Sequence, residues 1–219
     1  MAERAHGDTL PFPDRRAAGR LLGERLATMG TERPVVLALP RGGVAVASEI
    51  AARLGAPLDV LVTRKIGYPP QPELGVGAIA EGGEPVYDGL LMGKLGLRPA
   101  DLAGVVERER AELARRLLVY RGGRARPEVT GRDVILVDDG LATGVTARAA
   151  LRAVRAWRPA AAILAVPVGP PLTVQAMRAE ADGVVALVTP RRFRSVGEWY
   201  ASFGQLTDAD VLELLAAAR

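Results

Sequence analysis

The residues best suited to chemistry lie in one short segment, where two acids, Asp138 and Asp139, follow four apolar residues, V-I-L-V. The apolar run predicts a buried strand, and the turn G-L-A-T-G after the acids predicts the start of a helix. Backbone N–H groups at a helix start, with the positive end of the helix dipole, favour a phosphate. Thr143 and Thr146 add hydroxyl donors, and Gly144 lets the backbone come close to the anion. Because carboxylates would repel that phosphate, we expect them to accept hydrogen bonds from sugar hydroxyls of the same ligand.

A plain strand, turn and helix with an acidic cap is the alternative interpretation of this segment. A single acid there would be ordinary, whereas paired acids followed by A-T-G-x-T are much less so. The segment lacks the Gly-Lys-Ser/Thr of the Walker A loop. The chain has no cysteine and a single histidine, His6. This excludes a thiolate nucleophile and cysteine-bound zinc, and it disfavours a Ser-His-Asp triad within one chain.

Two other predicted strands also end in basic segments. Pro40-Arg41-Gly42-Gly43 follows the run V-V-L-A-L. Its glycines can expose amides to an anion, and Arg41 offers charge-assisted donors. Thr63-Arg64-Lys65 leads into a loop, Arg64 to Gly75, that we expect to be mobile, and Lys65 is one of two lysines beside twenty-seven arginines. That rarity suggests a need for a compact ammonium group there. A plain turn and a solvated basic pair are the alternatives.

Val134 to Thr146 resembles the motif that binds 5-phosphoribosyl-1-diphosphate (PRPP) in the type I phosphoribosyltransferases. The tetrapeptide from Pro40 resembles the diphosphate loop of that family, where a peptide bond is often cis. The basic pair resembles the stem of its flexible loop. Gly140 departs from the family, which usually has an aliphatic residue there, and Ala142 resembles the adenine enzymes rather than the 6-oxopurine enzymes. The PRPP-binding residues that the resemblance implies are Arg41, Gly42, Gly43, Arg64, Lys65, Asp138, Asp139, Gly140, Leu141, Ala142, Thr143, Gly144, Val145 and Thr146.

The acceptor is expected to meet a variable hood after the last predicted strand. Four of the nine aromatic residues fall there: Phe193, Trp199, Tyr200 and Phe203. Aromatic faces can stack on a planar ring, although packing onto the sheet would need the same residues. Glu81, in E-G-G, is a loose analogue of a loop glutamate in the adenine enzymes, and an exposed loop acid is an equal alternative. The sequence does not name the acceptor base.

The elements between these segments predict an α/β fold, a parallel twisted sheet with helices on both faces. In such sheets ligands bind at the carboxyl ends of the strands, near a switch in strand order. We expect one domain over residues 1–219, with a core at about 31–190, a hood at about 190–206 and a final helix at 207–218. The expected strands are Val35–Leu39, Leu58–Thr63, a hairpin-like pair at Val76–Glu81 and Pro85–Tyr87, Asp133–Val137, Ala161–Val166 and Val184–Thr189. The expected helices are Asp14–Met29, Val44–Leu54, Pro99–Tyr120, one ending near Trp157, Leu172–Ala181 and Thr207–Ala218.

Composition narrows the class of protein further. The net charge is +4, which suits either a basic surface or an anionic ligand. No basic run is longer than two residues, which weakens a nucleic-acid interpretation. No apolar run is long enough for a membrane span and no secretory signal is evident, so we expect a cytoplasmic protein. We also expect a homodimer.

The sequence therefore predicts a phosphoribosyltransferase that uses PRPP and a small planar base. The resemblance implies Mg²⁺ that enters with PRPP, with Asp138 and Asp139 as minor metal contacts. It also implies that Arg41 and Lys65 stabilise the leaving diphosphate while the acid pair holds the ribose, so that all four are catalytic. A PRPP-sensing regulator or nucleic-acid-binding protein on the same scaffold is the rival interpretation. The basic pI and the lack of a clear acid or base favour the rival, and the loop with Arg64 and Lys65 disfavours it.

Overall fold

The computed structural model describes residues 12–218, so His6 lies outside the described residues. The helices are α1 (Arg15–Ala27), α2 (Gly42–Leu54), α3 (Gly89–Lys94), α4 (Ala103–Arg121), α5 (Val145–Ala156), α6 (Pro171–Met177) and α7 (Asp208–Ala217), with 3₁₀ turns at Pro99–Leu102 and Gly197–Trp199. The strands are β1 (Val35–Ala38), β2 (Leu58–Val60), β3 (Thr63–Tyr68), β4 (Gln71–Ala80), β5 (Val86–Tyr87), β6 (Asp133–Val137), β7 (Ala161–Val168) and β8 (Gly183–Val188). Among these residues, no helix has the length and apolar character needed to cross a lipid bilayer.

Five strands form a parallel sheet in the order β2-β1-β6-β7-β8. Alternate residues of each strand face opposite layers. Val36 and Ile135, which are register partners, pack toward α1 and α2, whereas Leu37 and Leu136 pack toward α5 and α6. The predicted α/β architecture is therefore confirmed. The strand order reverses between β1 and β6, so the loops that follow these two strands meet at the ligand-binding edge.

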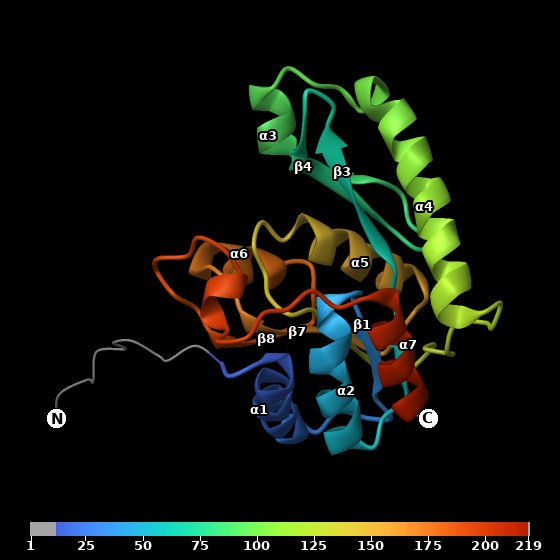
Figure 1. The fold of residues 1–219 in the computed structure, drawn as a ribbon, viewed down its shortest axis with the longest axis vertical. Coiled ribbons are helices and arrows are strands. Elements are labelled where there is room, and N and C mark those ends of the chain that lie inside the picture. Colours follow the sequence, from blue (N-terminus) through green and yellow to red (C-terminus); the bar gives the residue numbers. More distant parts are fainter. Residues whose placement is uncertain (1–11, 219) are drawn as a thin grey trace, which may run out of the picture.

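A second, antiparallel sheet, β3-β4-β5, rises away from the parallel sheet together with α3 and α4 (Figure 1). The predicted pairing of residues 76–81 with 85–87 is confirmed as β4 and β5. The loop expected over residues 64–75 is wrong as secondary structure, because β3 and the first half of β4 form a hairpin there. Pro69-Pro70 makes a two-residue turn, and Gly67 lets the Pro72 carbonyl approach at a bulge. The proline and glycine content thus marks a turn and a bulge inside paired strands.

The segment after β8 crosses back over the carboxyl edge of the sheet before α7. Tyr200 forms a parallel bridge with Phe12, and the Ala201 N–H donates to the Phe12 carbonyl at 2.7 Å. The helix predicted over Thr207–Ala218 is confirmed as α7, and a capping box between Thr207 and Asp210 begins it. Residues 190–206 thus form the hood, tied at its far end to the segment that precedes α1.

Candidate active site at the switch point

The loops after β1 and β6 lie against each other. A side chain at Gly42 would overlap the Asp139 carboxylate, and a Cβ at Gly43 would lie 2.7 Å from the Val137 carbonyl oxygen. Only glycines permit this approach. The Pro40–Arg41 peptide bond is cis, as the resemblance implied. The predicted diphosphate loop and acid pair are thus neighbours.

The turn after the acids presents a row of backbone donors. None of the N–H groups of residues 142–147 donates a hydrogen bond to another described residue. The turn is nevertheless fixed, because the Leu141 N–H donates to the Val168 carbonyl at 2.8 Å and Thr173 Oγ1 donates to the Ala142 carbonyl at 3.0 Å. Gly144 has a φ of +79°, which suits glycine. A fixed turn with free N–H groups at the start of α5 can hold a phosphate without rearrangement.

Each acid of the pair is held by specific neighbours. Burial raises the pKa of Asp138 well above its ordinary value, and the neighbouring Asp139 charge raises this pKa further. The Asp139 N–H donates to Asp138 Oδ1 at 2.9 Å. Asp139 Oδ2 forms an ion pair with Arg15 Nε at 2.7 Å. One oxygen of each carboxylate remains without a hydrogen bond to another described residue.

Arg15 is a site residue that sequence reasoning missed. It begins α1, which Asp14 caps, and its side chain is 11% exposed. The next residue is also an arginine, and nothing in the R-R pair distinguishes the one that contacts Asp139, 124 residues away. Only the packing of α1 beside α2, at the front of the sheet in Figure 1, brings the two together.

The predicted loop bases lie on the hairpin. Arg64 Nε pairs with Glu109 on α4 at 2.6 Å, and Lys65 Nζ donates to the Glu73 carbonyl at 2.8 Å. No hydrogen bond or ion pair of residues 12–218 joins Arg64 or Lys65 to the acid pair. The structure thus joins the motif and the diphosphate loop, and it holds these two cations on a separate unit.

The Glu81 side chain belongs to a buried cluster of charged residues. Its carboxylate pairs with Arg121, which is 6% exposed. The same guanidinium contacts Asp59 at 3.1 Å and donates to the Val60 carbonyl at 2.6 Å. Arg121 therefore ties the end of α4 to β2 and to the base of the hairpin. This geometry favours a structural role for Glu81 over contact with an acceptor.

The hood aromatics divide into two groups. Tyr200 is buried, and its ring lies 5.0 Å from that of Phe203 and 5.6 Å from that of Phe12. Phe193 and Trp199 are half-buried outside this stack. Within the described chain, packing thus accounts for Tyr200 and Phe203, and the other two rings remain candidates for contact with an acceptor.

The packing of the hood also explains why this chain has glycine at position 140, where the family usually has an aliphatic residue. A Cβ there would lie 2.8 Å from Val196 Cγ2 and closer still to Cγ1. An aliphatic residue at position 140 would displace the hood.

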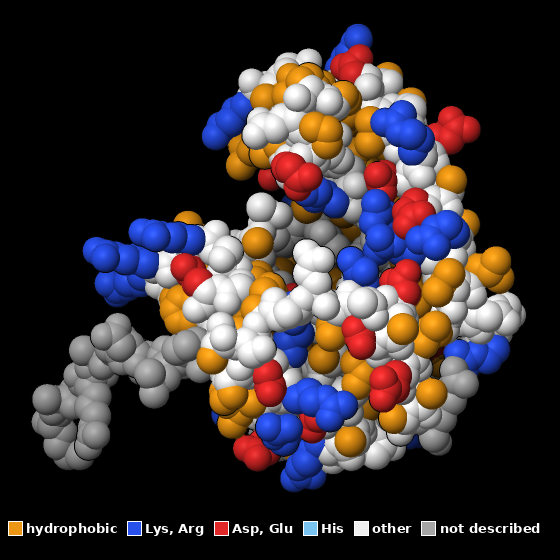
Figure 2. All heavy atoms as spheres, in the orientation of Figure 1, with side chains coloured by type: hydrophobic (Ala, Val, Ile, Leu, Met, Phe, Trp, Pro, Cys, Tyr) orange, Lys and Arg blue, Asp and Glu red, His pale blue; other side chains and the backbone are white. Residues whose placement is uncertain are grey.

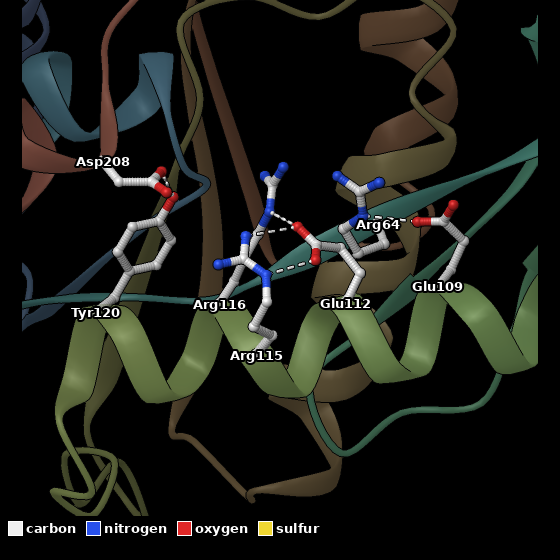
Figure 3. A network of polar contacts seen from close by, with 7 residues as sticks. All are labelled: Arg64, Glu109, Glu112, Arg115, Arg116, Tyr120 and Asp208. Carbon is white, nitrogen blue, oxygen red and sulfur yellow. Dashed lines mark hydrogen bonds and ion pairs between the residues drawn. The ribbon is translucent and has the colours of Figure 1, made fainter.

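A polar face of α4 borders the hollow between the hairpin unit and the parallel sheet. Figure 2 shows this hollow, with charged side chains gathered along its right-hand side. In Figure 3, Glu109, Glu112, Arg116 and Tyr120 of α4 point to one side of the helix, and Arg64 of β3 pairs with Glu109. Hydrogen bonds from Arg115 and Arg116 lower the pKa of Glu112 to about 2. A carboxylate with so low a pKa is a weak base, so Glu112 is poorly suited to remove a proton from an acceptor.

Comparison with known proteins identifies the family. The family model for the phosphoribosyl transferase domain matches residues 14–190. Two Mycobacterium tuberculosis proteins, from strains CDC 1551 and H37Rv, are each 46% identical over 207 residues, 94% of this chain, and carry phosphoribosyl transferase as a provisional name. The chain spans 47% of the length of those relatives.

Solved structures agree with this fold. The crystal structure of TT1426 from Thermus thermophilus has a TM-score of 0.80 and 45% identity, covering 95% of this chain and 99% of that one. AQ2163 from Aquifex aeolicus has a TM-score of 0.51 at 13% identity, covering 84% of this chain and 78% of that one, which shows a shared fold alone.

Proposed function

Because the chain belongs to the phosphoribosyl transferase domain family, we propose that it transfers the 5-phosphoribosyl group of PRPP to a nitrogen acceptor and releases diphosphate. The observation that carries this proposal is the row of free N–H groups at residues 142–147, fixed beside the acid pair. A 5-phosphate on those N–H groups would direct the ribose hydroxyls toward the carboxylates. No single plain anion would use both halves of this site.

The proposed reaction breaks the bond between C1 of the ribose and the diphosphate oxygen. A bond from the acceptor nitrogen to C1 forms, and the proton that the acceptor loses passes to the departing diphosphate or to water. Negative charge grows on the departing diphosphate, where Arg41 and the Gly42 N–H would stabilise the charge, whereas the Gly43 N–H donates to the Leu39 carbonyl at 3.1 Å. The carboxylates of Asp138 and Asp139 would favour the positive charge that develops on the ribose. Lys65 would add a cation once the hairpin closes over the ligand.

Magnesium is part of this proposal through the substrate. Residues 12–218 contain no group of three or more acidic, histidine or cysteine side chains suited to a metal. The free oxygens of Asp138 and Asp139 are hard ligands that fit Mg²⁺, but they are few. The ion would therefore be held mainly by PRPP and water, and when bound it would neutralise diphosphate charge.

The acceptor is proposed to be a planar nitrogen base. The half-buried Phe193 and Trp199 support this class. The names of the relatives give no base.

A panel of purine and pyrimidine bases tests the proposal. The protein is incubated with PRPP, Mg²⁺ and each base, and diphosphate release is measured. We expect release with at least one base and little without a base. PRPP binding without release for any base, together with a gel shift of random DNA or RNA, would instead favour a regulator on this scaffold.

A further inference from the structure

Arg15 lies in a polar and aromatic enclosure at the edge of the proposed ribose site. Its Nε contacts Asp139 Oδ2 at 2.7 Å, and its Nη1 donates to the Gly204 carbonyl at 2.7 Å. The Phe203 ring covers its guanidinium at 3.7 Å. The charge of Arg15 is thus held on one side by the motif and on two sides by the hood.

Asp139 is held at its side chain by α1 and at its backbone by the hood. Arg15 holds its carboxylate, and the Tyr200 hydroxyl donates to its backbone carbonyl at 2.5 Å. Its N–H is occupied by Asp138. Only one carboxylate oxygen of Asp139 is left for a ligand, so its direction is set by α1 and the hood and not by the motif alone.

The ion pair between Arg15 and Asp139 also affects the electrostatics of the acid pair. Two adjacent carboxylates in a partly buried site repel each other. The charged groups that act on Asp138 are Asp139 and Arg15, and Tyr200 is the other titratable group nearby. Arg15 therefore supplies the compensating cation.

We propose that Arg15 is a positioning residue of the PRPP site, which aims the Asp139 carboxylate at the ribose and couples the hood to ribose binding. This inference rests on the proposed function. Arg15 acts through Asp139 and does not itself touch the substrate. The residue is outside the PRPP motif, and its role depends on α1 and on hood contacts that the motif does not contain.

The adjacent Arg16 provides a matched control. Its side chain is 58% exposed and approaches Glu49 at 3.8 Å. Arg16 is also an arginine in the first turn of α1, but it forms no ion pair with Asp139. Any effect of charge loss on α1 in general should appear equally at both positions.

The test is calorimetry of PRPP with Mg²⁺ on Arg15→Ala, Arg15→Lys, Arg16→Ala, Asp139→Asn and the double variant Arg15→Ala/Asp139→Asn. We expect Arg15→Ala to weaken PRPP binding about tenfold or more, Arg15→Lys to recover part of the loss, and Arg16→Ala to match wild type. The double variant should bind as Asp139→Asn does, within about twofold, because Arg15 works through that carboxylate.

Two results would overturn the inference. One is an Arg15→Ala protein with a lower melting temperature but the PRPP affinity of Arg16→Ala. The other is a double variant whose loss equals the product of the two single losses. If Arg15→Ala does not fold, Arg15→Gln is measured by the same criteria. Wild type that fails to bind PRPP would reject the proposed function as a whole, whereas wild-type binding with an unaffected Arg15 variant would reject this inference alone.

Discussion

Three elements that are distant in the sequence reach Asp139: α1 through Arg15, the hood through Tyr200 and the diphosphate loop through Gly42. The acid pair itself could be predicted from the sequence, because a strand followed by two acids and a small-residue turn is a local pattern. The contacts that orient it could not. They depend on how α1 and the hood pack, and neither element carries a local signal for a contact with residue 139.

Lys65 is predicted to act in the transition state more than in ground-state binding. It lies on the hairpin, where its ammonium group donates to the Glu73 carbonyl. Lys65→Ala should lower kcat about tenfold or more and change KM for PRPP less. The only other lysine, Lys94, is exposed on α3 and provides the control. Wild-type kcat in Lys65→Ala would place Lys65 among the solvated charges.

Gly140 is predicted to tolerate no side chain while Val196 is present. Gly140→Ala should destabilise the protein by about 1–3 kcal/mol through overpacking, measured by thermal unfolding. Adding Val196→Ala should restore most of the loss. Gly93→Ala, on open surface with no atom within 4 Å of a new Cβ, should be neutral or slightly stabilising. Equal effects at both glycines would contradict the contact assigned to Val196.

At the scale of elements, most of the sheet and its helices could be predicted from apolar runs, caps and breakers. The capping box of α7 and the glycine stop of α2 are examples. The hairpin of β3 and β4 was missed because its pairing is stabilised from outside. Ile66 and Val76 are buried against the main core, and Arg64 pairs with α4. Composition alone cannot reveal such partners.

Arg121 is predicted to make the most stabilising polar contacts between α4 and the sheet. Arg121→Ala would leave Asp59 and Glu81 partly buried without a cation, so it should cost about 3–5 kcal/mol of unfolding free energy. Arg115→Ala, which breaks an ion pair of a side chain 55% exposed, should cost about 0–1 kcal/mol. Denaturant unfolding measures both. A small loss for Arg121→Ala would mean that α4 is held mainly by its apolar contacts and its other polar contacts, such as Arg64–Glu109.

At the scale of the whole molecule, the site has walls of different chemistry. Charged side chains gather along one side of the hollow beneath the hairpin unit, whereas the hood carries the half-buried rings of Phe193 and Trp199, with exposed arginines on both sides of Phe193 in the sequence. The meeting of the two strand-end loops could be predicted from the parallel sheet. The burial of Tyr200 against Phe12 could not, because it requires the chain to return from β8 to the segment that precedes α1.

Trp199 is predicted to face the acceptor. Trp199→Ala should raise KM for a reactive base about tenfold while PRPP affinity stays near wild type, since a stacked base gains roughly 1–3 kcal/mol. Steady-state kinetics with the active base, beside calorimetry of PRPP, separates the two effects. A lower melting temperature with unchanged acceptor kinetics would show that Trp199 serves packing.

The most direct test of the central claim is calorimetry of PRPP with Mg²⁺ on wild type and on Asp138→Asn/Asp139→Asn. If both carboxylates hold the ribose, the affinity for PRPP should fall more than about tenfold, above ~1.4 kcal/mol, when both become amides. Circular dichroism confirms that the variant is folded. A folded double variant that binds PRPP as tightly as wild type would contradict the assignment of this site.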